Sequence, residues 1–138
     1  MALPTIIELL GNGGDPIQMT VATSSAVPLN TLCKLTTPRT IAACSADNDA
    51  FGGIAANAHE ASTSSATSMT VYTHLIVGLT PVTASTIVAG NQVSINGANE
   101  IKVYTTLDGE KGYGFGTALS SNDTSSTTQI PVLINWGG

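Results

Sequence analysis

The chain has 138 residues and a net charge of −5, with four Lys and Arg residues against nine Asp and Glu. Four scattered cations cannot neutralise a phosphate backbone, and they give an anionic membrane surface little to attract. No apolar run approaches the about 20 residues of a membrane-spanning helix, and the N-terminus lacks the basic segment of a signal peptide. We therefore expect a protein made in a cytoplasm, with no nucleic-acid or membrane partner.

The composition predicts an all-β protein. Threonine, valine and isoleucine are abundant, and these residues suit pleated, half-buried surfaces. No segment has the apolar spacing of an amphipathic helix of three turns. The expected fold is a small antiparallel β-barrel or sandwich with an internal duplication and an extended N-terminal arm. We assign residues 1–16 to the arm and residues 17–138 to a single β-barrel domain, which is long enough to bury a core.

The arm carries a short apolar patch of Ile6, Ile7, Leu9 and Leu10, followed by a run of turn-forming residues. Four large aliphatic side chains outside the main body need a surface on which to be buried. Two interpretations are open: the arm folds back onto its own barrel, or it clasps a neighbouring subunit or a larger assembly. Together with Trp136, a further aromatic anchor, these four residues are the predicted contacts with a neighbouring subunit or a larger assembly.

The first half of the chain alternates in a way that predicts several strands. Residues 17–22 have period two, and residues 31–36 and 39–44 form a hairpin around Thr37-Pro38. A glycine-rich step follows at residues 50–56. After a polar stretch comes the longest apolar-rich run, residues 70–79, which we expect to be one central strand.

The second half repeats this order. After a short strand predicted at residues 86–89, residues 93–104 form a hairpin around Asn96-Gly97, a dipeptide that favours tight turns. A second glycine step at residues 113–119 and a terminal strand at residues 129–136 complete the unit. We interpret the chain as one β unit used twice. Glycines inside strands mark bulges or close backbone approaches, which favours a closed barrel.

Two cysteines flank the first predicted hairpin. Its four-residue loop would set Cys33 opposite Cys44, but a one-step change of register would break the geometry of a disulfide. In a cytoplasmic protein we expect two reduced, buried thiols, with a disulfide as the alternative.

No catalytic or metal site is predicted. Residues 47–49 begin like a calcium loop, but Phe51 and Ala58 stand where oxygen ligands belong, so a surface turn is the better interpretation. His59 lies in a polar loop and is expected to be solvated, and His74 falls in a strand. The chain has no nucleophile elbow and no close carboxylate pair in an apolar setting. We therefore predict no catalytic residue, no metal, no cofactor and no enzyme activity.

Several segments together carry a resemblance to a known family: residues 31–35, 40–43, 47–55, 89–99 and 112–119. Over roughly residues 17–135 the chain resembles the head decoration, or capsid cement, proteins of tailed bacteriophages. In that family a Gly-x-Gly-x-Ala-Leu run, present here from Gly114 to Leu119, recurs before a terminal strand. Pro131 departs from the usual alternating valines of that strand, and the N-terminal arm departs most.

The resemblance implies a non-enzymatic β-barrel on the outer surface of an icosahedral head, often as a homotrimer at three-fold positions. Its implied partner is the major capsid protein, whose subunit joints it reinforces, and its implied location is the virion. The arm is then expected to contact the capsid, so deleting residues 2–15 should abolish attachment and leave the fold intact. The rival hypothesis is a receptor- or glycan-binding surface module of a virion, to which exposed Ser/Thr loops are suited.

Overall fold

The computed structural model describes residues 3–10, 16–22, 25–47, 49–60, 67–82, 86–104, 114–122 and 128–135. All regular elements among them are β-strands, which confirms the predicted all-β class. None of the described residues forms a helix with the length and apolar character of a membrane span. The strands are β1 (Thr5–Leu9), β2 (Ile17–Val21), β3 (Leu32–Thr37), β4 (Thr40–Ala43), β5 (Phe51–Ala55), β6 (Ser68–Tyr72), β7 (His74–Pro81), β8 (Gln92–Ile95), β9 (Glu100–Val103), β10 (Gly116–Ala118) and β11 (Ile130–Asn135).

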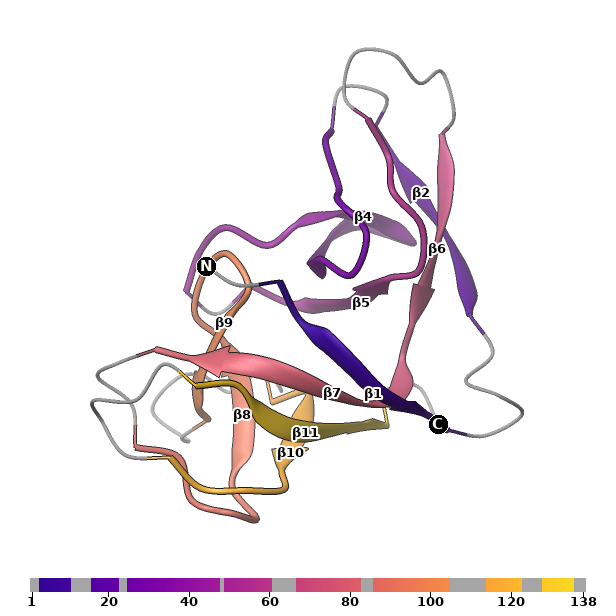
Figure 1. The fold of residues 1–138 in the computed structure, drawn as a ribbon. Helices are drawn as coiled ribbons and strands as arrows, with labels where there is room; N and C mark the ends of the chain where they lie inside the picture. Colours follow the sequence, from indigo (N-terminus) through magenta and orange to yellow (C-terminus); the bar gives the residue numbers. More distant parts are fainter. Residues whose placement is uncertain are drawn as a thin grey trace.

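The strands close into two small barrels, one above the other in Figure 1. The first barrel has the order β2-β4-β3-β5-β6. The second has the order β7-β11-β10-β8-β9 and is closed by the pairing of β7 with β9, while β1 adds to β7 from outside. We had expected a single barrel over residues 17–138. That expectation was wrong in the number of barrels, because each repeat closes on itself.

The two barrels have the same topology and the same register. In each, the first strand pairs in parallel with the third and antiparallel with the fifth. The pair Cys33–Ala43 corresponds to Val93–Val103, and Gly53 and Gly116 pair with Cys33 and Val93 respectively. The predicted internal duplication is therefore present.

The turns repeat as well. Arg39 (φ 53°) in the β3–β4 turn corresponds to Asn99 (φ 58°) in the β8–β9 turn, and Asn30 (φ 66°) corresponds to Gly90 (φ 97°). Left-handed backbone at non-glycine positions is uncommon. The left-handed residue therefore recurs at equivalent positions, although the two turns differ two residues earlier, where Gly97 (φ 115°) stands in place of Thr37.

Two predicted strands differ from the structure. The single strand expected at residues 70–79 is divided at the buried Thr73, because β6 closes the first barrel and β7 opens the second. Residues 86–89 contain no strand. There the chain turns instead, with the Asn91 N–H donating to the carbonyl of Val88 at 2.9 Å.

The repeated glycine is explained by the strand beside it. A Cβ on Gly53 would lie 2.6 Å from the Val71 side chain, and a Cβ on Gly116 would lie 2.8 Å from Cγ1 of Val132. Such distances leave no room for a side chain. Gly53 has in addition a φ of +118°, a conformation that glycine adopts without steric cost.

The core has two clusters, and one of them, which we call the shared core, contains side chains of both barrels. The interior of the first barrel forms its own cluster around Val21, Ile41 and Val71. The interior of the second barrel forms a larger cluster, which also takes in side chains from the outer face of the first barrel, such as the fully buried Leu32 and Ile54. Burial of this face holds the barrels together.

The cysteine pair is separated by a bulge. At the turn Thr37 pairs with Thr40, a register that would bring Cys33 opposite Cys44, but the pairing shifts between Leu35 and Thr37. Cys33 is therefore opposite Ala43 and faces the first barrel's interior, whereas Cys44 faces the shared core. The expectation of two buried thiols outside a disulfide is confirmed.

Candidate interaction surfaces

No reaction centre is visible in the part of the chain that the structure describes. No group of three or more His, Cys, Asp and Glu side chains lies close enough together there to hold a metal ion. The prediction of a solvated His59 was wrong. Its side chain is buried, with Nδ1 2.6 Å from the carbonyl of Ser25, because the backbone of His59 bridges to Val27 and draws the segment inward. His74 lies in β7, as expected for a strand residue.

The acidic segment at residues 47–49 connects the barrels. Asp49 Oδ2 accepts hydrogen bonds from the N–H groups of Ser45 and Ala46 at 2.8 and 2.9 Å, which is the geometry of a turn. Asp47 Oδ1 lies 2.7 Å from Nζ of Lys102 in β9 of the second barrel. These carboxylates are therefore engaged in structure, and the turn interpretation is the one that their contacts support.

The described part of the arm folds back onto its own chain. β1 pairs with β7, and the register shifts at Ile7, which has no partner. Because of this bulge, Ile6 and Leu9 turn inward against the shared core, while Ile7 points out and is 56% exposed. Gln129 Nε2 also holds the start of the arm by donating to the Leu3 carbonyl at 2.7 Å. Of the two interpretations, the structure favours attachment to its own barrel for Ile6 and Leu9.

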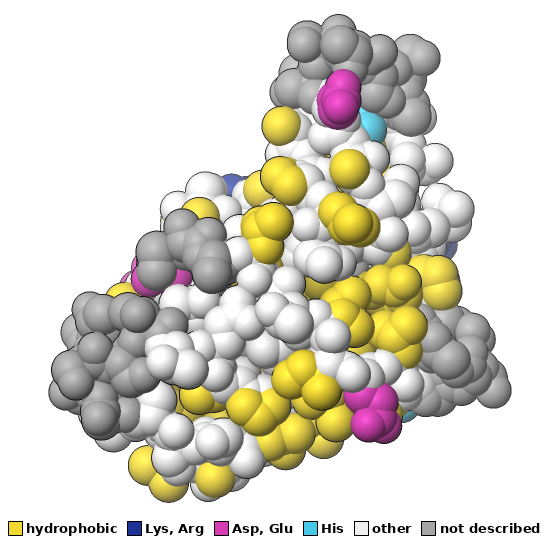
Figure 2. All heavy atoms as spheres, in the orientation of Figure 1, with side chains coloured by type: hydrophobic (Ala, Val, Ile, Leu, Met, Phe, Trp, Pro, Cys, Tyr) yellow, Lys and Arg dark blue, Asp and Glu magenta, His cyan; other side chains and the backbone are white. Residues whose placement is uncertain are grey.

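An apolar surface remains on the outside of β1. Leu3 is 46% exposed and Leu10 is half-buried, and Ile17 at the start of β2 is also exposed. Hydrophobic side chains gather on this face around the part that β1 crosses and where the two barrels meet (Figure 2). Trp136, the fifth predicted contact, lies outside the described residues. We call Leu3 and Ile7 the β1 surface.

The barrels meet through a second, internal surface. The rings of Phe51 and Phe115 stack with centroids 4.6 Å apart and planes 3° from parallel. Beside them the Leu32 N–H donates to Oδ1 of Asn99 at 2.9 Å, from the outer face of β3 to the β8–β9 turn. This contact fixes how one repeat packs on the other.

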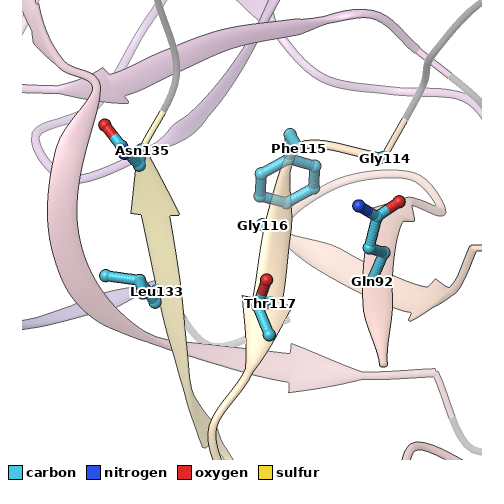
Figure 3. A pocket seen from close by; sticks show the side chains of 7 residues that line it. All are labelled: Gln92, Gly114, Phe115, Gly116, Thr117, Leu133 and Asn135. Atoms are coloured by element: carbon cyan, nitrogen blue, oxygen red, sulfur yellow. The ribbon is translucent and has the colours of Figure 1, made fainter. Parts of the chain in front are cut away.

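The equivalent face of the second barrel is open. Its β8, β10 and β11 present a groove of about 350 Å³ (Figure 3). Gln92, Thr117, Leu133 and Asn135 project into it, and Gly114, Phe115 and Gly116 complete its lining. We call this the β8–β10–β11 groove. The groove was not predicted from the sequence, although the repeat carried a signal: the buried Leu32 and Ile54 of the first copy correspond to Gln92 and Thr117 of the second.

Comparison with known proteins bears on the fold. No family model matches the sequence, and no curated protein matches it at a significant level. Among solved structures, the fold is similar to the N base of head fiber gp8.5 of bacteriophage phi29. The TM-score is 0.52 at 13% sequence identity, and the match covers 88% of this chain and 93% of that chain. The likeness therefore extends over both barrels.

Proposed function

We propose that this chain is a structural protein of a phage head, which binds the outer capsid surface and stabilises joints between major capsid protein subunits. The observation that carries the proposal is the shared fold with the base of a phage head fiber over most of both chains. The described surface supports it, since it offers contact faces and no clustered reactive side chains. The trimer implied by the family resemblance is part of the proposal.

The β1 surface is the proposed capsid contact. Its exposed Ile7 is held by a bulge, a feature that re-aims a side chain away from the sheet. Deletion of residues 2–15 would be a poor test of this contact, because it would also remove Ile6 and Leu9 from the shared core. A substitution at Ile7 changes the contact surface alone.

The test is co-sedimentation of the purified chain with mature heads that lack their outer protein. Wild-type protein should bind saturably, at a fixed ratio to the major capsid protein. Ile7→Glu should weaken binding about tenfold or more, since burying one large aliphatic side chain contributes about 1.5 to 3 kcal/mol. Val88→Glu is the matched control, because Val88 is 53% exposed and lies in a turn of the second barrel. Absence of saturable binding by folded wild-type protein would refute the proposal.

One observation favours the receptor- or glycan-binding alternative. The β8–β10–β11 groove is lined by the amides of Gln92 and Asn135 and the hydroxyl of Thr117, which are groups that sugars can bond. Binding of the isolated chain to a glycan array, without binding to heads, would favour this alternative.

A further inference from the structure

We infer that copies of this chain join head to tail, with the β3–β4 turn of one copy seated in the β8–β10–β11 groove of the next. The inference comes from the repeat and not from the proposed capsid role, so the two can fail separately.

The contact between the two barrels within one chain supplies the template. On the first barrel it involves Leu32 of β3 and Cys44, the residue after β4, and on the second barrel it involves the β8–β9 turn. The Leu32 N–H donates to Asn99 Oδ1 at 2.9 Å, and the Cys44 thiol donates to the Gly97 carbonyl at 3.1 Å. A turn of one repeat thus packs against the outer sheet face of the other.

Because the chain is duplicated, each of the two parts of this contact has an equivalent in the other repeat. Neither equivalent takes part in the contact between the two barrels. The β3–β4 turn of the first barrel corresponds to the β8–β9 turn, and its residues Thr37, Pro38 and Arg39 are all exposed. Arg39 has the left-handed backbone of Asn99, so the free turn shares this feature with the engaged one, while Thr37 takes the place of Gly97.

The groove is the equivalent, on the second barrel, of the first barrel's outer face. Gln92 and Thr117 correspond to Leu32 and Ile54, and Leu133 corresponds to Tyr72, as the strand registers require. Two residues before the paired glycine, Phe51 of the first barrel is replaced by Gly114. Gly114 brings no side chain of its own to this face, and a Cβ there would lie 3.0 Å from Oε1 of Gln92 and 3.2 Å from the ring of Tyr104.

The chemistry of the turn and the groove is complementary. The groove offers amide and hydroxyl oxygens from Gln92, Thr117 and Asn135 as acceptors. Arg39 is exposed and uses Nη2 to donate to the Gln18 carbonyl at 2.8 Å, and a guanidinium has further donors to offer. A polar contact of this kind suits copies that fold separately and then associate, whereas the apolar junction inside the chain is permanent.

A contact between different surfaces of identical chains is heterologous. Such contacts form a closed ring if the rotation between copies closes, and a filament if it does not. A ring of three copies would supply the proposed trimer. The same inference identifies the groove as a site for a second copy of this chain rather than for a small ligand.

Cysteine cross-linking of the full chain tests the contact directly. Arg39→Cys protein is mixed with Gln92→Cys protein and oxidised mildly at pH 8. Cys33 and Cys44 are buried and stay out of the reaction. We expect a mixed disulfide between the two variants, about tenfold more abundant than that from the control mixture of Ala58→Cys with Gln92→Cys. Ala58 is exposed and adjoins His59, whose backbone pairs with Val27 on the segment before β3, whereas the β3–β4 turn follows β3.

Sedimentation velocity provides the second measurement. Thr117→Trp fills the groove and should weaken self-association about tenfold, while Thr117→Ala should retain it. The inference is overturned if folded wild-type chain is a monomer at all concentrations, or if the mixed disulfide does not exceed that of the Ala58→Cys control. The inference is also overturned if Thr117→Trp self-associates as strongly as the wild type. A glycan that binds the monomeric wild-type chain but not Thr117→Trp would overturn it as well.

Discussion

The two barrels share a topology and a register but differ in the environment of equivalent side chains. On the outer face of the first barrel, Leu32 and Ile54 are fully buried against the second barrel. At the same positions of the second barrel, Gln92 is exposed and Thr117 is half-buried. Alternating inward residues specify the barrel in both copies, whereas the outward residues decide what each barrel packs against.

The barrels also differ in how they protect an open sheet edge. The edge of β7 from Leu75 to Gly78 is covered by β1. The equivalent edge of β2 has no further strand among the described residues. There Pro16 lacks an N–H group, and Arg39 binds the carbonyl of Gln18. Proline and charged side chains at an edge discourage unwanted pairing with other chains. The exposed strand edge is therefore protected by Pro16 and Arg39 in the first barrel and by β1 in the second.

The largest expected effect concerns the glycine that both barrels need. Gly53→Ala should lower the free energy of unfolding by about 4 kcal/mol, because it combines overpacking against Val71 with an unfavourable backbone angle. Gly116→Ala meets a similar obstruction from Val132, but the backbone of Gly116 is not left-handed, so this substitution should cost about 2 kcal/mol. Urea unfolding of the three proteins measures both differences.

A third glycine, Gly97, can separate the two causes of the expected Gly53→Ala destabilisation, which are overpacking and the backbone angle. Gly97 has a φ of +115°, and a Cβ there would meet nothing within 4 Å. Gly97→Ala should therefore show the cost of the backbone angle alone, about 1 kcal/mol. If Gly53→Ala costs no more than this control, the close approach of Val71 does not explain the repeated glycine.

An exchange of residues between equivalent positions has the next largest effect. Ile54→Thr should cost about 2 to 3 kcal/mol, since it removes apolar contact from the junction and buries a hydroxyl. The reciprocal Thr117→Ile lies on the open groove and should stay within about 0.5 kcal/mol of wild type. Chemical unfolding followed by fluorescence gives both values. Equal costs would mean that the two outer faces are not as different as their burial indicates.

Part of the fold could be predicted from the sequence because the repeated features are local. The Asn96-Gly97 turn, the alternating residues of β2 and the glycine steps all act over a few residues, and each is found where it was expected. The number of barrels depends on which strands close on each other. The parallel pairs β2–β4 and β7–β9 that close them have no local signal.

Bulges and burial were harder to predict. The bulges at Thr36 and Ile7 shift a register by one residue, and this decides that Cys33 misses Cys44 and that Ile7 faces outward. His59 is surrounded by polar residues in sequence, yet its backbone pairs with Val27 across the barrel end and buries it. The groove could have been predicted from the sequence by comparing the two repeats residue by residue.

A pH-dependent effect also follows from that comparison, at the position where the first barrel has Cys33 and the second has Val93. Burial, with a smaller effect of Cys44, raises the pKa of the Cys33 thiol from 9.0 to about 12. The folded protein therefore holds this proton more tightly than the unfolded chain. Its contribution to stability is complete below pH 9 and is lost as the pH rises from 9 toward 12.

Between pH 8 and pH 10.5 we expect Cys33 to account for about 1 to 2 kcal/mol of lost stability. Cys33→Val, which installs the residue of the second barrel, should remove that part of the pH dependence. The remaining part includes Cys44, whose pKa burial raises to about 11, and is common to both proteins. Urea unfolding at the two pH values gives the difference. Identical pH slopes would show that the Cys33 thiol titrates alike in the folded and unfolded chains, and so is not shielded by the first barrel's interior.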